Sequence, residues 1–495
     1  MIQHLLSQLP ALQVVLPLVA APLCVLLRRG NAAWTVYAAT TAATFAIAVV
    51  LAMRVAADGP VSYHMGGWAP PAGIEYRIDA LNAFVLMIVG GIAAALAPYA
   101  RRSVAAEING ERVYLFYCLL LLCLSGLLGI VATGDAFNLF VFLEISSLSS
   151  YALIAMGAKR RALLAAFQYL VMGTIGGTFL LIGVGFLYQM TGTLNMLDLA
   201  ARLPAVEDTN TVRAGLAFIV VGISLKLALV PLHLWLPNAY AYAPSAVSVF
   251  LAATGTKVAA YALIRFLFTV FGAGYAFGTL PLGEILILLA VAAMLYGSVA
   301  AIYAADAKRL LAWSSIAQIG YIVLGASLAT AAGLTAGILH LLNHAVIKGA
   351  LFMALGALFW RVRGSRIDDL AGLGRLMPWT CAALVAGGLG LVGVPATAGF
   401  ISKWYLLEAV LAEGRGWLAA AILASSLLSI VYIGRLIEAL YFRTPAAHIE
   451  AGEAPVGMLA ATWLLVAASI GLGLYATPAA DYARAAAAGL LGGGP

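Results

Sequence analysis

The chain has 495 residues, of which 64% are hydrophobic and only 9% are charged. Soluble domains carry roughly 25% charged residues, so this composition excludes a water-soluble fold and indicates an all-α multi-pass membrane protein in a lipid bilayer. The net charge of +7 does not indicate nucleic-acid binding, because the basic residues lie in short clusters between apolar runs. Such clusters control membrane topology.

The cysteines do not indicate a disulfide framework or a metal site. All four lie in apolar stretches without CxxC or zinc-ligand spacing: Cys24, Cys118, Cys123 and Cys381. The chain also lacks a dinucleotide-binding fingerprint and a cluster of iron–sulfur ligands. We therefore expect no cofactor and no metal, and a transporter subunit rather than an enzyme.

Apolar runs between polar breaks predict about fourteen membrane spans within a single membrane domain over residues 1–495. Their predicted ranges are 9–28, 33–54, 79–100, 113–133, 136–157, 162–189, 212–241, 245–271, 281–304, 310–329, 332–360, 379–411, 416–442 and 456–477. The seventh and twelfth spans are too long for one straight crossing and contain Pro231 and Pro395 in mid-run. Proline removes a backbone donor and clashes with the preceding turn, so both helices should break there. Breaks at membrane depth are tolerated around protein-lined cavities.

The loops predict an orientation, because most loop lysines and arginines lie in the odd-numbered loops. Positive loops stay in the cytoplasm, which places both termini on the outer, periplasmic side. Arg28 and Arg29 follow the first apolar segment rather than precede it, so we expect a retained span instead of a cleaved signal peptide.

The order of the spans also suggests internal repetition. Spans four to eight (113–271) and nine to thirteen (281–442) form two five-helix blocks, each with a broken helix as its fourth member. An odd number of helices inverts the second block relative to the first, a recurring plan in transporters. Residues 1–100 and 456–477 would flank the two blocks.

A few charged residues lie inside the predicted spans, and such residues usually serve a relay or binding role. Glu144 is surrounded by apolar residues, and we expect it to pair with Lys226, five residues before Pro231. Burial of a charged ammonium costs free energy, which disfavours the protonated form, so a lysine there can exchange its proton. The alternative is a fixed structural ion pair, although such pairs are poor stabilising devices.

Lys257, Tyr261 and Arg265 are spaced at i, i+4 and i+8 on one helical face. We expect Lys257 to lie deep and to take part in a relay. We expect Arg265 to approach the interface and reach the headgroups with its long side chain.

The eleventh span carries a polar stripe of His340, His344 and Lys348, again at i, i+4 and i+8. Imidazole both accepts and donates a proton near neutral pH, so the histidines are suited to link the lysines. A metal site is disfavoured because lysine is a poor ligand and no carboxylate shares the stripe. Lys348 lies near the predicted cytoplasmic end and could instead be a snorkelling anchor.

Lys403 follows the Pro395 break, where glycine and proline should expose backbone carbonyls to water. A lysine beside such an opening could load or unload protons on one side of the membrane. Arg435 and Glu438, at i and i+3, are expected to form an interfacial salt bridge.

The same residues resemble those of a known family, the antiporter-like proton-pumping subunits of respiratory complex I, membrane-bound hydrogenases and Mrp cation/proton antiporters. The matching segments are Arg77-Ile-Asp-Ala-Leu81, Lys226-Leu-Ala-Leu-Val-Pro-Leu-His-Leu-Trp-Leu-Pro-Asn-Ala239, Ala243-Pro-Ser-Ala-Val-Ser248 with Lys257, Asn343-His-Ala-Val-Ile-Lys348 and Gly393-Val-Pro-Ala-Thr-Ala-Gly399 with Lys403. The resemblance implies fourteen helices, an inverted repeat and a hydrated polar axis. It implies Glu144 and Lys226 as a charge pair, Lys257 and the histidines as the central relay, and Lys403 as the distal gate.

Within that family, the segment Thr133-Gly-Asp-Ala-Phe-Asn-Leu-Phe-Val-Phe-Leu-Glu144 looks most like the D-type subunit of Mrp Na⁺/H⁺ antiporters. The resemblance implies a hetero-oligomeric complex in a bacterial inner membrane that exchanges H⁺ for Na⁺. A pump module of complex I or of a hydrogenase is the alternative, and lysine rather than a carboxylate at position 403 points away from one complex I subunit. Alternatives from other classes are a non-transporting scaffold subunit and a carrier of an organic solute.

Overall fold

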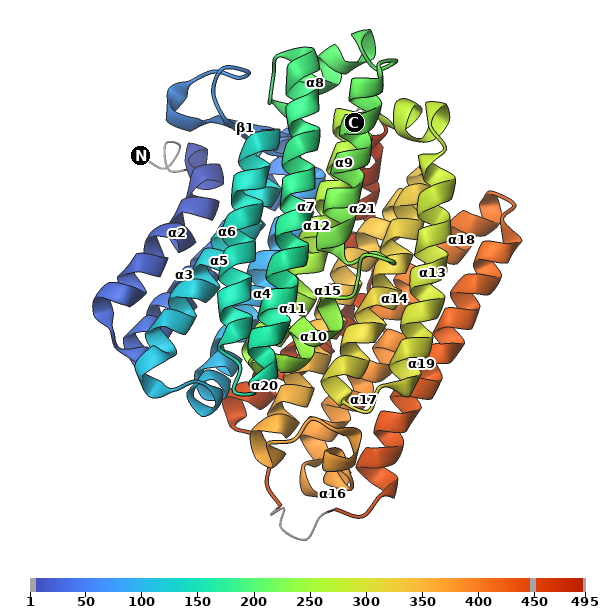
Figure 1. The fold of residues 1–495 in the computed structure, drawn as a ribbon. Helices are drawn as coiled ribbons and strands as arrows, with labels where there is room; N and C mark the ends of the chain where they lie inside the picture. The colour runs from blue at the N-terminus through green and yellow to red at the C-terminus, as the bar shows by residue number, and fades with distance from the viewer. Residues whose placement is uncertain (1–5, 446–450, 493–495) are drawn as a thin grey trace.

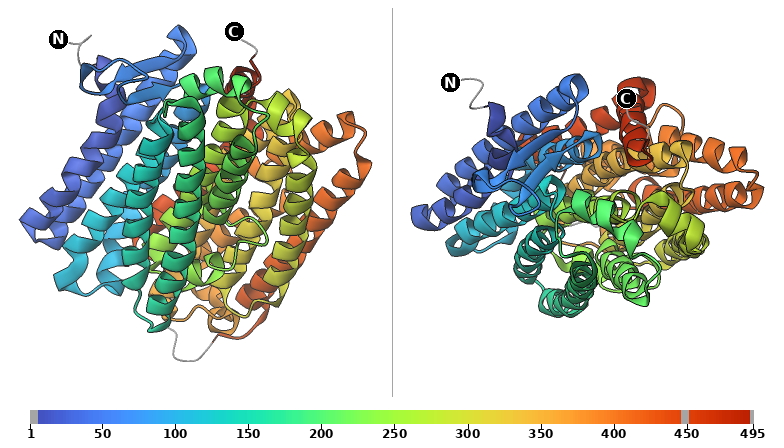
Figure 2. Two further views of the ribbon diagram at one scale, coloured as in Figure 1. Left: turned by 45° about the horizontal axis from the view of Figure 1, so that its top comes forward. Right: turned by 90° about the horizontal axis from the view of Figure 1, so that it is seen from above.

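The computed structural model describes residues 6–445 and 451–492 and is almost entirely helical. In the described residues, 13 helices are long and apolar enough to cross a membrane, or up to 14 if a bent pair counts as one span. The helices stand side by side in one bundle, and both ends of the chain lie at the same end of it (Figures 1 and 2). The predicted all-α membrane fold is confirmed.

The long helices follow the predicted order. The first half contains α2 (Leu9–Leu27), α3 (Gly30–Asp58), α4 (Ala80–Glu107), α5 (Val113–Ala132), α6 (Ala136–Ala155), α7 (Arg161–Thr191), α9 (Asn210–Leu227), α10 (Leu236–Tyr242), α11 (Ser245–Ala253) and α12 (Gly255–Ile264), which continues as the π-helix η4 (Arg265–Val270). The second half contains α13 (Leu282–Tyr303), α14 (Ala307–Ser327), α15 (Ala331–Val362), α17 (Pro378–Val392), α18 (Ala398–Ala412), α19 (Gly416–Phe442) and α20 (Val456–Leu474).

Both predicted helix breaks are present, and in each case the helix ends about four residues before the proline. The helix α9 ends at Leu227, and Ala228 has a left-handed backbone with φ of 61°. The helix α17 ends at Val392, followed by Gly393 with φ of 91°. A proline ring clashes with the carbonyl four residues earlier, which explains where both helices stop. The twelfth predicted span is therefore two helices of 15 residues each, α17 and α18.

A third break was not predicted. The eighth span is interrupted at Thr254, which separates α11 from α12 and has φ of −123° and ψ of −54°. The following residue is Gly255, but no proline marks the position. The break therefore depends on tertiary packing rather than on a strong local signal.

Several short elements between the spans were also missed. A two-stranded antiparallel hairpin joins α3 to α4, with β1 (Val61–His64) paired to β2 (Glu75–Ile78). The helices α8 (Met196–Arg202) and α21 (Thr477–Leu490) lie at the same end of the bundle as the hairpin (Figure 1). Remaining short turns are η1 (Met65–Gly67), η2 (Gly110–Arg112), η3 (Leu203–Ala205), η5 (Gly274–Thr279), η6 (Ile367–Leu370) and α16 (Leu373–Leu376).

The helix α15 is the centre of the bundle. It packs against α4, α11, α14, α17, α18, α20 and α21. Most of its length is buried, including the polar residues His340, Asn343, His344 and Lys348. The titratable stripe predicted from the sequence therefore lies in the interior of the protein and does not face lipid.

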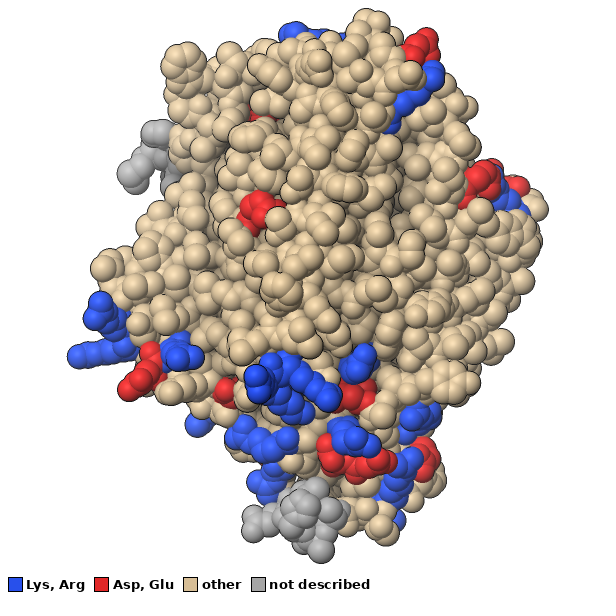
Figure 3. All heavy atoms as spheres, in the orientation of Figure 1, with Lys and Arg blue, Asp and Glu red and all other residues tan. Residues whose placement is uncertain are grey.

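The surface separates into a broad apolar belt and a basic lower end in the view of Figure 3, where the blue side chains gather. By the positive-inside rule that end is expected in the cytoplasm. The two described ends of the chain lie at the opposite end (Figure 2). Their placement outside the cell stays a prediction, as does the inverted relation of the two five-helix blocks.

Three predicted placements of charged residues are wrong. Lys308 precedes the predicted tenth span (310–329) and was therefore expected in a loop, but it is 4% exposed and donates to the Ala243 carbonyl and the Ser245 hydroxyl. Arg435 donates to carbonyls at the end of α13, while Glu438 forms its ion pair with Arg443 at 2.8 Å. The expected Arg435–Glu438 bridge fails because both side chains find closer partners on neighbouring segments.

Arg265 does not reach the headgroups. It is 7% exposed, and its guanidinium contacts Asp79 at 2.8 Å and Asn82 at 2.8 Å. Asp79 also caps α4 by accepting the backbone N–H groups of Leu81 and Asn82. Burial alone would raise the pKa of Asp79, but the Arg265 guanidinium outweighs burial, so the pKa lies below its ordinary value.

We expect Asp79→Ala to destabilise the protein by about 3–5 kcal/mol, because the Arg265 guanidinium would remain buried without its carboxylate. Thermal unfolding of the purified protein in detergent measures the effect. The contribution of the wild-type pair should be complete above about pH 4 and be lost as the pH falls through the lower folded pKa.

Asp208→Ala is the matched control, since its ion pair with Arg213 spans 3.8 Å between largely exposed side chains. Exposed pairs contribute about 1 kcal/mol or less. Equal unfolding midpoints for the two variants would show that the Asp79–Arg265 pair does not stabilise the bundle.

Candidate functional site: a buried line of lysines and histidines

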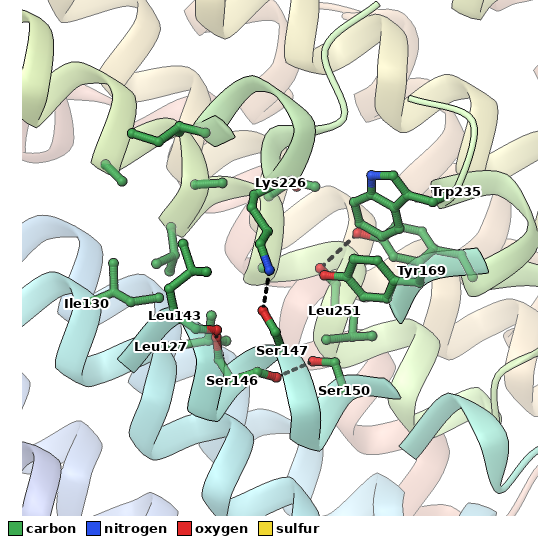
Figure 4. Close-up of a pocket in the computed structure, with 17 residues that line it drawn as sticks. Leu127, Ile130, Leu143, Ser146, Ser147, Ser150, Tyr169, Lys226, Trp235 and Leu251 are labelled. Carbon is green, nitrogen blue, oxygen red and sulfur yellow. Dashed lines mark hydrogen bonds between the residues drawn. The ribbon is translucent and has the colours of Figure 1, made fainter. Parts of the chain in front are cut away.

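Lys226 lies in the last turn of α9 and points toward one face of α6 (Figure 4). Its ammonium donates to the Ser147 hydroxyl at 2.7 Å and to the Tyr151 hydroxyl at 3.4 Å. The Glu144 carboxylate lies 3.6 Å from the ammonium, an ion pair longer than a hydrogen bond. Glu144, Ser147 and Tyr151 are spaced at i, i+3 and i+7, so one face of α6 supplies all three of these polar contacts to Lys226.

Two glycines of α7 make room for this group. A Cβ atom at Gly177 would lie 2.3 Å from Oε1 of Glu144, and one at Gly173 would lie 1.9 Å from the Tyr151 hydroxyl. A side chain at either position would force the Glu144 carboxylate or the Tyr151 hydroxyl to move, so glycine at both positions permits the close approach. The two glycines thereby fix how near α7 comes to the charged pair.

A small cavity of about 40 Å³ lies between Lys226 and the break in the eighth span. Its lining includes Lys226, Ser147 and Thr256. That volume holds roughly two or three water molecules, and the three side chains offer them hydrogen-bond partners. Thr256 in turn accepts a 3.5 Å hydrogen bond from Lys257. The cavity thus separates Lys226 from Lys257 by a space that water can bridge.

Lys257 is fully buried on α12. Its ammonium donates to the backbone carbonyl of Ala252, which lies in the last turn of α11. The break at Thr254 leaves this carbonyl available, because helix-terminal carbonyls lack intrahelical donors. The partial negative charge at a helix C-terminus also favours a cation there. Lys257 therefore has a neutral acceptor and no carboxylate partner in the described structure.

His340 is held between two neutral groups in the core. Its Nε2 lies 3.0 Å from Oε1 of Gln318, and its Nδ1 lies 2.8 Å from the Ser402 hydroxyl. An amide oxygen only accepts, so Nε2 donates to Gln318, whereas the Ser402 hydroxyl can donate to Nδ1 or accept from it. The Nδ1 atom, which faces α18, therefore keeps a hydrogen-bond partner whether or not it carries a proton.

His344 stacks on His340, with ring centroids 5.9 Å apart and planes inclined by 14°. It is 1% exposed, and neither ring nitrogen has a hydrogen-bond partner in the described structure. His344 lies one helical turn from both His340 and Lys348 on α15, so it stands between the other two titratable groups of this stripe. A buried unsatisfied imidazole is costly and requires an explanation.

Lys348 lies in the middle of α15 and is fully buried, so the snorkelling alternative is wrong. Its ammonium donates to the Leu311 carbonyl at 2.7 Å and to the Ser314 hydroxyl, both on α14. The sequence suggested an edge position because α15 is much longer than one membrane crossing. Only the packing of α14 against α15 decides that its middle lies in the core.

Lys403 uses the acceptors that the Pro395 break creates. Its ammonium donates to the carbonyls of Leu391 at 3.0 Å and Val392 at 2.9 Å, and to the Ser426 hydroxyl at 3.0 Å. In a continuous helix the Leu391 carbonyl would accept from residue 395, but proline has no N–H. The opening predicted at the Pro395 break is therefore occupied by the Lys403 side chain, which is 6% exposed.

The structure brings most of the predicted residues together. Lys257, His344, Lys348, His340 and Lys403 come from α12, α15 and α18 and form one electrostatically connected group. Glu144 and Lys226 form a second group beyond the small cavity. No cluster of three His, Cys, Asp or Glu side chains that could hold a metal occurs among residues 6–445 and 451–492.

A vestibule of about 860 Å³ opens at the end that carries the hairpin and α21. Its lining includes Asp79, Asn82 and Arg265. Asn82 donates to the hydroxyl of Tyr261 at 2.9 Å, one helical turn from Lys257 on α12. The Asp79–Arg265 pair therefore stands between the vestibule and the buried line, a role that sequence reasoning missed.

Sequence reasoning also passed over His233, two residues beyond Pro231. It is 4% exposed, its ring nitrogens have no hydrogen-bond partner in the described part of the chain, and it packs on Trp313 with ring centroids 5.4 Å apart. Its place beside a helix-breaking proline was the signal that could have selected it. The acceptors Ser147, Gln318 and Ser402 had no such signal, because serine and glutamine are common in many contexts.

Comparisons with known proteins identify relatives of this chain. The family described as "NADH:quinone oxidoreductase/Mrp antiporter, TM" matches residues 133–429. The N-type subunit of an NADH-quinone oxidoreductase from Desulforudis audaxviator is 43% identical over 485 residues, covering 95% of this chain and 96% of the relative. The D-type subunit of a Na⁺/H⁺ antiporter from Alkalihalophilus pseudofirmus is 29% identical over 438 residues, covering 88% and 87%.

Among solved structures, a chain of the membrane-bound sulfane sulfur reductase, an archaeal respiratory membrane complex, superposes with a TM-score of 0.90. It is 33% identical, and the superposition covers 98% of each chain. The matched family segment spans both helix breaks and all seven predicted site residues. This chain therefore belongs to the family of antiporter-like membrane subunits shared by NADH:quinone oxidoreductases and Mrp antiporters.

Proposed function

We propose that the chain moves protons across the membrane along the buried line from Glu144 and Lys226 to Lys403. One observation carries this proposal: four of the five buried amines and imidazoles beyond the small cavity are held only by neutral acceptors. Carbonyls and hydroxyls bind Lys257, Lys348 and Lys403, and an amide and a hydroxyl bind His340. Losing a proton at such a site leaves no carboxylate unpaired in the core.

Each part of the line supports a different step. A proton that neutralises Glu144 removes the charge that favours protonated Lys226, so the amine can release its proton into the small cavity. Water there would pass it toward Thr256 and Lys257. His344, surrounded by three lysines, provides the next acceptor, and His340 can gain a proton on one nitrogen and lose one from the other. Lys403 would exchange protons at the far end.

The chain is proposed to work inside a hetero-oligomeric membrane complex, because its relatives are named as subunits. For the driving reaction we propose exchange with Na⁺. Three features support this proposal: the lysine at position 403, the segment before Glu144, and the similarity to the D-type Na⁺/H⁺ antiporter subunit. Hard cations require several oxygen ligands, and among the described residues Glu144 is the one carboxylate that forms an ion pair with an amine of the line, at 3.6 Å. We therefore place the cation path partly in neighbouring subunits.

A second candidate is a redox-driven pump. One observation favours it: the 43% identical relative over 95% of the chain is a subunit of an NADH-quinone oxidoreductase. The residues of the proton line would do the same work in either complex, because the driving reaction resides in partner subunits.

We expect Glu144→Gln and Lys226→Ala to abolish transport while the protein still assembles, because both remove a titratable group from the start of the line. The measurement is dissipation of a pH gradient in everted vesicles from an antiporter-deficient host that expresses the whole operon. Glu111→Gln, on an exposed turn, is the control and should keep full activity. Loss of assembly together with activity would instead indicate a scaffold subunit.

Gly177→Ala should impair transport with little change in stability. The added Cβ would meet the flexible end of Glu144 at 2.3 Å, so the carboxylate must move away from Lys226. Gly185→Ala on the same helix is the matched control, because nothing lies within 4 Å of its Cβ. Transport in everted vesicles and thermal unfolding are compared for both variants. Equal transport by the two would contradict a role for the Glu144 position.

The same vesicles distinguish the two driving reactions. Exchange predicts that added Na⁺ dissipates the pH gradient and that Lys226→Ala prevents this. A redox pump predicts no response to Na⁺ but a pH gradient that forms during electron transfer to a quinone and disappears in Lys226→Ala. A complex that assembles and shows neither response would refute proton transport by this chain.

A further inference from the structure

The basic lower end of the molecule (Figure 3) contains a cavity of about 820 Å³. It lies between the start of α7, the end of α10, the turn joining α13 to α14 and the loop after α15. Its lining includes five basic side chains: Lys159, Arg160, Arg161, Arg309 and Arg366. Segments far apart in the sequence therefore bring their positive charges to one hollow, rather than spreading them over separate loops.

Most of these charges have no carboxylate partner in the described structure, and Arg366 has only a long ion pair, at 3.9 Å, with the exposed Asp368. The carboxylate in the lining is Asp306, whose oxygens accept the Arg309 backbone N–H at 3.0 Å and the Ser365 hydroxyl. Lys159 and Arg160 make no side-chain hydrogen bond or ion pair in the described structure, and neither does the Arg309 side chain. The cavity therefore presents a strong positive field with few internal acceptors.

The walls of the cavity are fixed by backbone pairing. Asp306 and Arg366 form an isolated antiparallel bridge. Ala307 donates to the Ser365 carbonyl at 2.7 Å, and Ile367 donates to the Ala305 carbonyl at 3.0 Å. This pairing places Arg366 opposite Asp306, three residues before Arg309. On the other side, the Arg161 guanidinium donates to the Tyr242 hydroxyl at 3.3 Å.

Aromatic and apolar surface continues from the cavity along the membrane face. Tyr303 and Trp313 are part of the lining, and the Tyr303 side chain is 82% exposed at the end of α13. Val299 and Tyr296, one and two turns earlier on α13, are 42% and 49% exposed. Tyrosine and tryptophan belong at the headgroup level of a bilayer. A soluble anion would use only the charges, whereas a lipid would use both features.

We propose that this cavity binds the phosphate of an anionic phospholipid from the leaflet at the basic end, with its acyl chains along α13. Guanidinium groups bind phosphate oxygens in a bidentate manner, and basic pockets between membrane helices on the cytoplasmic side accept anionic headgroups. The bound lipid would link the first half of the bundle, through α7 and α10, to the second half, through α13 and α14. This proposal is independent of the proton line.

The test is native mass spectrometry of the purified complex after exchange into detergent with phosphatidylglycerol or phosphatidylcholine. We expect phosphatidylglycerol to remain bound and phosphatidylcholine to be lost. Lys159→Gln with Arg160→Gln should weaken phosphatidylglycerol binding about thirtyfold, since each cation near a lipid surface contributes roughly 1 kcal/mol. Both residues lie in an exposed turn, so this variant should fold.

Arg309→Gln with Arg366→Gln tests the opposite wall and should weaken binding to a similar degree. The control is Arg28→Gln with Arg29→Gln, which removes the same charge from exposed positions in the turn between α2 and α3, outside the cavity. Equal phosphatidylglycerol retention by all variants would overturn the proposal. So would equal retention of phosphatidylcholine, or displacement of the lipid by inorganic phosphate at the same concentration, which would indicate a free-phosphate site.

Discussion

The whole arrangement depends on how a lysine ammonium can be accommodated in a membrane interior. Each buried charge needs acceptors, and the bundle supplies them in two ways. Helix breaks free carbonyls: Lys403 takes those of Leu391 and Val392 at the Pro395 break, and Lys257 takes the Ala252 carbonyl at the Thr254 break. Elsewhere, hydroxyl groups and the second lone pair of a helical carbonyl accept, as Ser147 does for Lys226 and Leu311 for Lys348.

Neutral acceptors also distinguish the proposed proton line from a set of purely stabilising ion pairs. A carboxylate partner would hold each ammonium in its charged form, since removing either charge would strand the other. Lys226 alone has such a partner, at 3.6 Å, and it retains hydroxyl acceptors from Ser147 and Tyr151. The proposed line therefore begins at a charge pair and continues through groups whose protonation state can change without an unpaired carboxylate.

The helix α15 positions several of these titratable residues at the centre of the fold. It contributes His340, His344 and Lys348, and it contacts both halves of the bundle. Small residues allow the close packing around it: a Cβ at Gly399 would lie 2.0 Å from the Gly390 carbonyl, where α18 passes α17. At the end that carries the hairpin, the Asp79–Arg265 pair and Asn82 separate a wide vestibule from Tyr261 and the core.

The sequence by itself predicted the helical membrane fold, the two proline breaks and the interior positions of Lys226, Lys257, His340, His344 and Lys403. Hydrophobic length, proline chemistry and the cost of charge in lipid are local properties that can be read along the chain. The tertiary structure decided the partners. Arg265 pairs with Asp79 across 186 positions, Lys348 lies in the core rather than at an edge, and Thr254 interrupts a helix without a proline. Such contacts depend on which helices are neighbours, because α4, α14 and α18 approach their partners only when the bundle packs.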